Sequence, residues 1–151
     1  MASINSATYT AQTTDPKDTT NNLTLGRPVV YYEATIATSA DFTTAGDTAN
    51  LFKVPKGLRC IPELSSITCE ALGTTATLDI GDDDAGNTAD ADRYNDGTDV
   101  HAAASVNFSG GVASLTPVTT TTSTTIIATL VTAASITLDK KITIKMAFVR
   151  I

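Results

Sequence analysis

Seven of the chain's 16 acidic side chains lie in one stretch, Ile80–Val100, and these are the first residues to consider for chemistry. The stretch reads I-G-D-D-D-A-G-N-T-A-D-A-D-R-Y-N-D-G-T-D-V and contains one basic residue, Arg93. Carboxylate and carbonyl oxygens are the ligands that a hard cation such as Ca²⁺ prefers. We predict that the stretch is a long acidic loop between strands, which could bind a cation, meet a basic partner or simply be solvated.

The spacing of these aspartates does not match the EF-hand calcium loop. That loop needs an acidic or amide side chain at position 5 and Glu at position 12. Counting from Asp82, position 5 is Gly86 and position 12 is Arg93. A cation site of another kind would draw on the remaining aspartates, namely Asp82, Asp84, Asp90 and Asp92. The residue types favour the plainer alternative, in which Gly and Asn form turns that Asp caps and solvates, so we predict no metal site.

The chain has one histidine, His101, and the spacing from Asp99 would put both side chains on one strand face. A hydrolytic triad also needs a nucleophile held against the histidine, and no G-x-S-x-G turn is present. Aspartates clustered in a Gly-rich loop are poorly buried, whereas a general acid needs a raised pKa. Gly-rich phosphate-binding motifs are also missing. We predict no enzyme activity, no catalytic residues and no cofactor.

Two cysteines, Cys60 and Cys69, are the remaining reactive side chains. Together with a single histidine they cannot supply four zinc ligands within one chain. A cytosolic compartment would keep both thiols reduced. We interpret them as two small buried hydrophobic residues.

Charge and hydropathy exclude further classes of partner. A net charge of −6, a pI near 4.5 and scattered basic residues argue against binding to nucleic acid. No apolar run approaches the roughly 18 residues of a membrane-spanning helix. The first residues lack the basic and apolar regions of a signal peptide, so we expect synthesis in a cytoplasm.

The elements that would position these residues are strands. The chain contains 29 threonines and few aromatic residues, which favours β-structure with an aliphatic core. Period-two alternation and turn signals predict about eight short strands and an all-β fold, a β-sandwich or jelly-roll-like domain. The predicted strands are Val29–Ala37, Asn50–Val54, Leu58–Ile61, Ser65–Ala71, Thr75–Ile80, Val112–Val118, Ile126–Val131 and Lys141–Ile151.

Three local features extend this prediction. Pro55-Lys56-Gly57 is a turn signal that predicts a hairpin between the strands on either side. The alanines within His101–Phe108 leave a short helix possible there. The regular alternation of Lys141–Ile151 predicts a strand near the centre of a sheet.

Residues 1–28 are polar and contain almost no apolar side chain before Leu23 and Leu25, so they cannot bury enough surface to fold alone. They are either a disordered tail or an extended arm that orders against a neighbouring subunit, and we favour the arm. The predicted organisation is an N-terminal arm over 1–28 and a β-sandwich domain over 29–151. Within the domain, Ile126–Val131 is apolar on both faces, which predicts burial on both sides or contact with another subunit.

Three phrases stand out within this short, acidic, Thr-rich and Trp-free chain: T-L-D-I-G-D at Thr77–Asp82, A-D-R-Y-N-D-G-T-D-V at Ala91–Val100 and K-I-T-I-K-M-A-F-V-R at Lys141–Arg150. Together they resemble the head decoration (cement) proteins of tailed bacteriophages. The resemblance covers roughly residues 29–151. It implies a virion protein, made in the host cytoplasm and usually trimeric, on the capsid exterior. There it would clamp neighbouring copies of the major capsid protein.

The resemblance also suggests which residues form interfaces. Ile127, Thr129 and Val131 would pack around the threefold axis of a homotrimer, and the arm would dock through Leu23, Leu25 and Arg27. The alternative is a receptor- or carbohydrate-binding module of a phage fibre or tail, with the acidic stretch as its binding edge. The low aromatic content counts against it, since Tyr94 is the one aromatic residue there. A secreted Ca²⁺-dependent adhesin is a third alternative, which the missing signal peptide disfavours.

Overall fold

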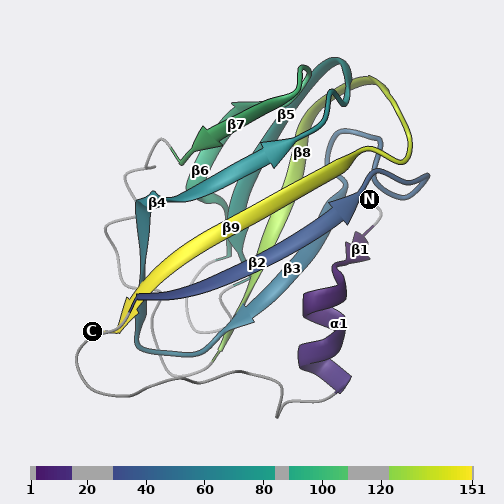
Figure 1. Ribbon diagram of the computed structural model, residues 1–151. Coiled ribbons are helices and arrows are strands. Elements are labelled where there is room, and N and C mark those ends of the chain that lie inside the picture. Colours follow the sequence, from purple (N-terminus) through teal and green to yellow (C-terminus); the bar gives the residue numbers. More distant parts are fainter. Residues whose placement is uncertain (1–2, 15–28, 84–88, 109–122, 151) are drawn as a thin grey trace.

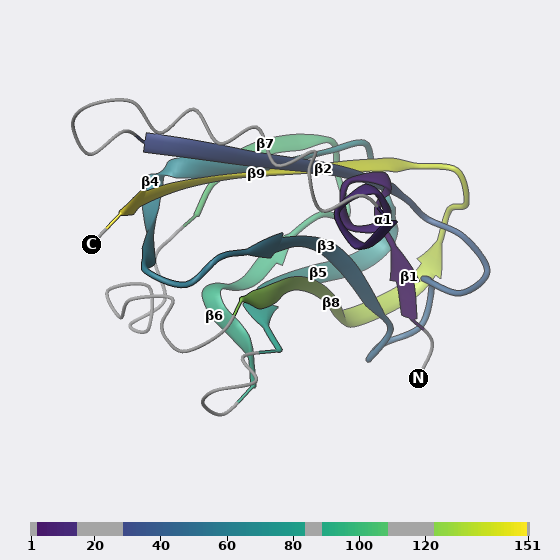
Figure 2. The ribbon, with the colours of Figure 1, turned by 90° about the horizontal axis from the view of Figure 1, so that it is seen from below.

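A computed structural model describes residues 3–14, 29–83, 89–108 and 123–150. Two β-sheets pack face to face, and one short helix, α1 (Ala7–Thr14), lies beside them (Figures 1 and 2). The five-stranded sheet has the order β1 (Ser3–Asn5), β3 (Thr48–Val54), β8 (Thr124–Ile136), β5 (Gly73–Asp82), β6 (Asp90–Asp99). The four-stranded sheet has the order β2 (Val29–Ala37), β9 (Lys141–Arg150), β4 (Leu58–Cys69), β7 (Ala104–Asn107). The predicted all-β sandwich is confirmed.

The core forms where the apolar faces of the two sheets meet. Strands β2 and β9 pair antiparallel without a register shift, from Val29 opposite Val149 to Ala37 opposite Lys141. Their alternate side chains point inward, as the period-two pattern predicted. The Tyr32 ring stacks on Phe52 of the opposite sheet at 5.3 Å between centroids, which joins the two layers. Strand β9 lies between β2 and β4, so the prediction that the last strand is central is confirmed.

The predicted hairpin around Pro55–Gly57 is wrong. Strand β3 pairs with β1 and β8, whereas β4 pairs with β9 and β7, so the turn carries the chain from one sheet to the other. The turn residues fix a reversal of direction, and Gly57 supplies the positive φ of 81° that it needs. They do not fix the pairing partner, which depends on which apolar faces meet in the core.

Strand β4 runs continuously through Pro62, where two separate strands were predicted. Its pairing with β9 shifts register between Ile61 and Ser66, because proline cannot donate a ladder hydrogen bond. The buried Ser65 hydroxyl replaces the missing bonds: Oγ donates to Ile61 O at 2.8 Å and accepts from Ala147 N at 3.0 Å. The interruption is therefore a satisfied bulge.

Residues 3–14 differ from the extended arm expected for 1–28. Strand β1 pairs parallel with β3, and Ile4 packs against the core. Ser6 caps the helix that follows: its Oγ accepts from Tyr9 N at 3.0 Å and donates to Leu51 O. Ile4 of β1 and the Ser6 cap thus attach the polar residues 3–14 to the sandwich. The arm residues Leu23, Leu25 and Arg27 lie outside the described residues.

Helix α1 lies beside the edge strand β2 (Figures 1 and 2). The Thr8 hydroxyl donates to Glu33 O on β2 at 2.9 Å. The helix therefore provides a hydrogen-bond donor at the edge of the four-stranded sheet.

Two further segments complete the comparison with the sequence. Ala104–Asn107 forms strand β7, so the short helix considered within His101–Phe108 is not formed. The predicted strand Val112–Val118 lies outside the described residues. Within the part of the chain that is described, no helix is long and apolar enough to cross a membrane.

Candidate interaction surfaces

Most of the acidic stretch is β-strand, which corrects the expectation of a long loop over Ile80–Val100. Strand β5 continues to Asp82 and β6 starts at Asp90, with Asp82 opposite Asp90 and Thr77 opposite Asp99. Gly81 allows this pairing, because a Cβ there would lie 1.9 Å from Asp90 O. The glycine that suggested a loop instead lets two backbones approach closely.

A buried polar group lies near the turn of this hairpin, at the end of β5. The Tyr94 hydroxyl donates to Asp82 Oδ2 at 2.7 Å, and Arg93 Nε lies 2.9 Å from the same oxygen. Asp82 is 3 % exposed and Tyr94 is fully buried. Burial first, and then the charge of Asp82, raise the pKa of Tyr94, so its hydroxyl stays protonated and donates.

The Arg93 guanidinium completes this group. Burial opposes its charge, but the nearby Asp82 carboxylate outweighs that effect and raises the pKa of Arg93. Asp82 thus contacts two side chains of its own chain, and its role is structural. This is a different use from the cation ligand considered for it, and Asp84 lies outside the described residues.

The aspartates of β6 have a different environment, at the edge of the sheet. Asp92, Asp96 and Asp99 are exposed. A hydrogen bond with Asp90, then burial, then the charge of Asp90 raise the pKa of Asp92. Among the described residues, no group of three His, Cys, Asp or Glu side chains is placed to hold a metal ion.

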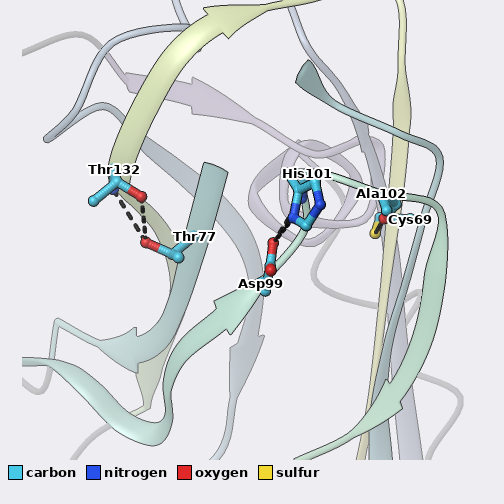
Figure 3. Close-up of polar contacts among 6 residues, drawn as sticks. All are labelled: Cys69, Thr77, Asp99, His101, Ala102 and Thr132. Carbon is cyan, nitrogen blue, oxygen red and sulfur yellow. Dashed lines mark hydrogen bonds and ion pairs between the residues drawn. The ribbon is translucent and has the colours of Figure 1, made fainter. Parts of the chain in front are cut away.

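His101 and Asp99 contact each other (Figure 3), but His101 lies beyond the last residue of β6, so the predicted shared strand face is not formed. Asp99 Oδ1 lies 2.5 Å from His101 Nδ1 and accepts from His101 N at 3.0 Å. The backbone hydrogen bond first, then the ring contact, lower the pKa of Asp99. Both side chains are at least half exposed, so the pair lacks the sheltered site that acid–base catalysis needs.

Both cysteines are buried and unbonded to each other, as interpreted from the sequence. Burial raises the pKa of the Cys60 thiol to about 11, against the lowering effect of a Ser65 hydrogen bond. Cys69 Sγ donates to Ala102 O at 3.6 Å (Figure 3). Burial raises the pKa of this thiol too, so both act as packing residues and not as nucleophiles.

The predicted trimer residues lie on the outer face of the central strand β8. Ile126, Ala128 and Leu130 point into the core, whereas Ile127 and Thr129 are half-buried on the other side. Val131 is 44 % exposed. In the register, Ile127 is opposite Asn50 and Gly81, so the apolar side chain has polar and small neighbours. The structure places these three residues on one strand, and their role at an interface stays a prediction.

The sequence analysis missed an apolar patch on the outer face of the four-stranded sheet, which we call the Tyr31 patch. It consists of Val29, Tyr31, Ile61 and Val149. Tyr31 and Ile61 lie opposite Ala147, and Val29 lies opposite Val149. Tyr31 is 50 % and Val29 39 % exposed, and Lys145 Nζ lies 4.7 Å from the centre of the Tyr31 ring. The available signal was the V-V-Y-Y start of β2, which is apolar on both faces.

The other end of the same face is polar. Thr35 and Thr143 hydroxyls lie 2.9 Å apart, and Thr68 and Ser105 hydroxyls lie 3.0 Å apart. These four residues share one row across β2, β9, β4 and β7. The face therefore changes along its strands from apolar to hydroxyl-bearing.

Chains of known structure have a similar fold. No protein-family model matches the chain, and no curated protein matches it. A chain in the capsid of Ralstonia phage GP4 has a TM-score of 0.68 at 18 % identity, with 82 % of this chain and 84 % of that chain covered. A chain in the capsid asymmetric unit of cyanophage Pam1 has a TM-score of 0.64 at 21 % identity, with 90 % and 99 % covered. The chain thus shares its fold with components of two phage capsid structures.

Proposed function

We propose that this chain is a phage capsid decoration protein, which binds the outside of the head and stabilises contacts between major capsid subunits. The observation that carries the proposal is the match of nearly the whole sandwich to chains of two phage capsids. The sequence phrases that resemble decoration proteins support it independently. The function needs a stable domain with extensive outer surfaces, and the described residues provide both.

The proposed assembly is a homotrimer on the capsid exterior, formed after synthesis in the host cytoplasm. Ile127, Thr129 and Val131 on the outer face of β8 would surround the threefold axis. Leu23, Leu25 and Arg27 would dock the arm on a neighbouring subunit. Because β1 and α1 belong to the sandwich, the arm in this proposal is confined to residues 15–28.

The alternative, a carbohydrate- or receptor-binding module, is weakened further. Tyr94 was the aromatic residue available for stacking on a sugar at the acidic edge, and its side chain is fully buried beneath Asp82 and Arg93. The role of the acidic segment as a sugar-binding edge is therefore not proposed.

Binding to heads tests the proposed function. Heads of the encoding phage that lack this chain are mixed with the purified protein, and we expect co-sedimentation and a higher temperature of head disruption. A variant with Leu23→Ser, Leu25→Ser and Arg27→Ala leaves β1 and α1 in place, and we expect it to bind heads weakly while remaining folded. Binding to host cells or glycans without binding to heads would instead favour the alternative.

A further inference from the structure

The Tyr31 patch lies on a sheet face that no element of the described chain covers. Strands β2, β9, β4 and β7 form one outer layer of the sandwich, and the five-stranded sheet packs on their inner side (Figure 2). Val29 and Tyr31 are two of the six large hydrophobic side chains that the described residues expose. Their register places Val29 beside the half-buried Val149, which extends the apolar surface from β2 onto β9, whereas Ala147 beside Tyr31 is fully buried.

Two cationic side chains flank this patch on the same face. Arg59 lies opposite Val149 in the register and is exposed, and Lys145 lies over the Tyr31 ring. Glu33, opposite Lys145, is the acidic side chain in the same rows. Tyrosine and arginine are residue types enriched at interfaces, and the positive charges of Arg59 and Lys145 favour an acidic partner.

The complementary surface is on the same chain. The net charge of −6 divides into −7 between positions 79 and 99, where eight aspartates accompany one arginine, and +1 elsewhere. Strand β6 carries Asp92 and Asp96 on the edge of the five-stranded sheet, in the layer opposite the Tyr31 patch (Figure 2). The two surfaces therefore cannot meet within one molecule, but they can meet between molecules.

We infer that the Tyr31 patch binds the acidic β5–β6 hairpin of a second copy of this chain. The contact is head-to-tail, since a different surface of each copy takes part, and repeated contacts of this kind close into a ring when the rotation allows. Apolar burial around Tyr31 provides affinity, and the charges orient the two copies and speed their association. The Tyr31 patch and the outer face of β8 lie on opposite sides of the sandwich, so this contact is distinct from the one around the proposed threefold axis and does not rest on the proposed function.

Light scattering after size exclusion, over a dilution series, tests the inference. We expect the wild-type chain to have a mass that is a multiple of 15.6 kDa and that decreases towards 15.6 kDa at high salt. Tyr31→Ser and Arg59→Glu should each weaken association about tenfold or more. Lys141→Glu is the matched control: it makes the same change of sign on the exposed side of β9, at the polar end, and association should stay unchanged.

Exchanging charges between the two surfaces tests whether the β5–β6 hairpin is the segment that binds the Tyr31 patch. Asp92→Arg with Asp96→Arg should weaken association, and combining both with Arg59→Glu should restore part of it. Asp41→Arg, at an exposed loop position, is the control. The circular dichroism spectrum and thermal midpoint of each variant should match those of the wild type, since all these positions are exposed.

Three results would overturn the inference: a wild-type monomer at every concentration, association insensitive to the patch variants, or patch-dependent association that the charge exchange never restores. The head-binding experiment separates this from the proposed function. A chain that binds heads as a monomer would retain the function and lose the inference, whereas patch-dependent oligomers that ignore heads would do the reverse.

Discussion

The two strands of the acidic hairpin use the same residue type in opposite ways. At the end of β5, the Asp82 carboxylate is buried and holds Tyr94 and Arg93. Along β6, the exposed carboxylates of Asp92, Asp96 and Asp99 face solvent. The difference shows that aspartates clustered in a sequence need not share one environment or one role. Burial and hydrogen-bond donors decide whether a carboxylate supports the fold or forms a surface.

The strongest test of this comparison is Asp82→Ala. It leaves the Arg93 charge and the Tyr94 hydroxyl without their shared acceptor in a buried site, and removing one partner of a buried ion pair costs about 3–5 kcal/mol. Urea unfolding should show a loss of this size. Asp96→Ala, on the exposed edge, should change stability by less than about 0.5 kcal/mol. Equal losses of stability in the two variants would contradict the contrast between buried and exposed aspartates.

Tyr94→Phe tests the contributions within the buried group of Asp82, Tyr94 and Arg93. The ring still fills the core, but Asp82 Oδ2 loses its hydroxyl donor and keeps Arg93. Loss of a buried hydrogen bond to a charged group costs about 1–3 kcal/mol, so the effect should be smaller than that of Asp82→Ala. The same urea experiment measures it, and an unchanged midpoint would mean that the hydroxyl contributes nothing to the hairpin.

The smallest expected effect distinguishes exposed aspartates from each other. The pKa of Asp99 is lowered from 3.8 by its His101 contacts, so its contribution to stability is present above that value and is lost as the pH falls. The pKa of Asp92 is raised from 3.8 by Asp90, so ionisation of Asp92 opposes folding and stability declines as the pH rises through that raised pKa. Carboxyl NMR titration should show Asp99 losing its proton at a lower pH than Asp92. The reverse order would contradict both environments.

The sequence predicted strands best where alternation was clear. β2, β5 and β9 have apolar residues at every second position, and each was found with the predicted face inward. β6 was missed because Asp, Gly and Asn have low strand propensity, and its stability comes from non-local contacts of Tyr94 and Gly81. The hairpin at Pro55–Gly57 failed for a related reason, since pairing depends on partners distant in sequence.

The candidate site was less predictable than the fold. Neither the Asp82 group nor the Tyr31 patch follows from spacing alone, because both join residues from different strands. The attachment of Ser6 to the sandwich was also hidden, since the Leu51 carbonyl that accepts from its hydroxyl lies 45 residues away. Sequence patterns report faces and turns, whereas these features require a known register.

Helix α1 affects the tendency of the protein to aggregate at high concentration. A long, regular edge strand such as β2 is a template on which further strands can add, and natural proteins often cover such edges. The Thr8 hydroxyl donates to the Glu33 carbonyl, so the helix occupies a position where an incoming strand would have to bond. Residues 3–14 thus protect this edge of the sheet against the addition of strands from other copies of the chain.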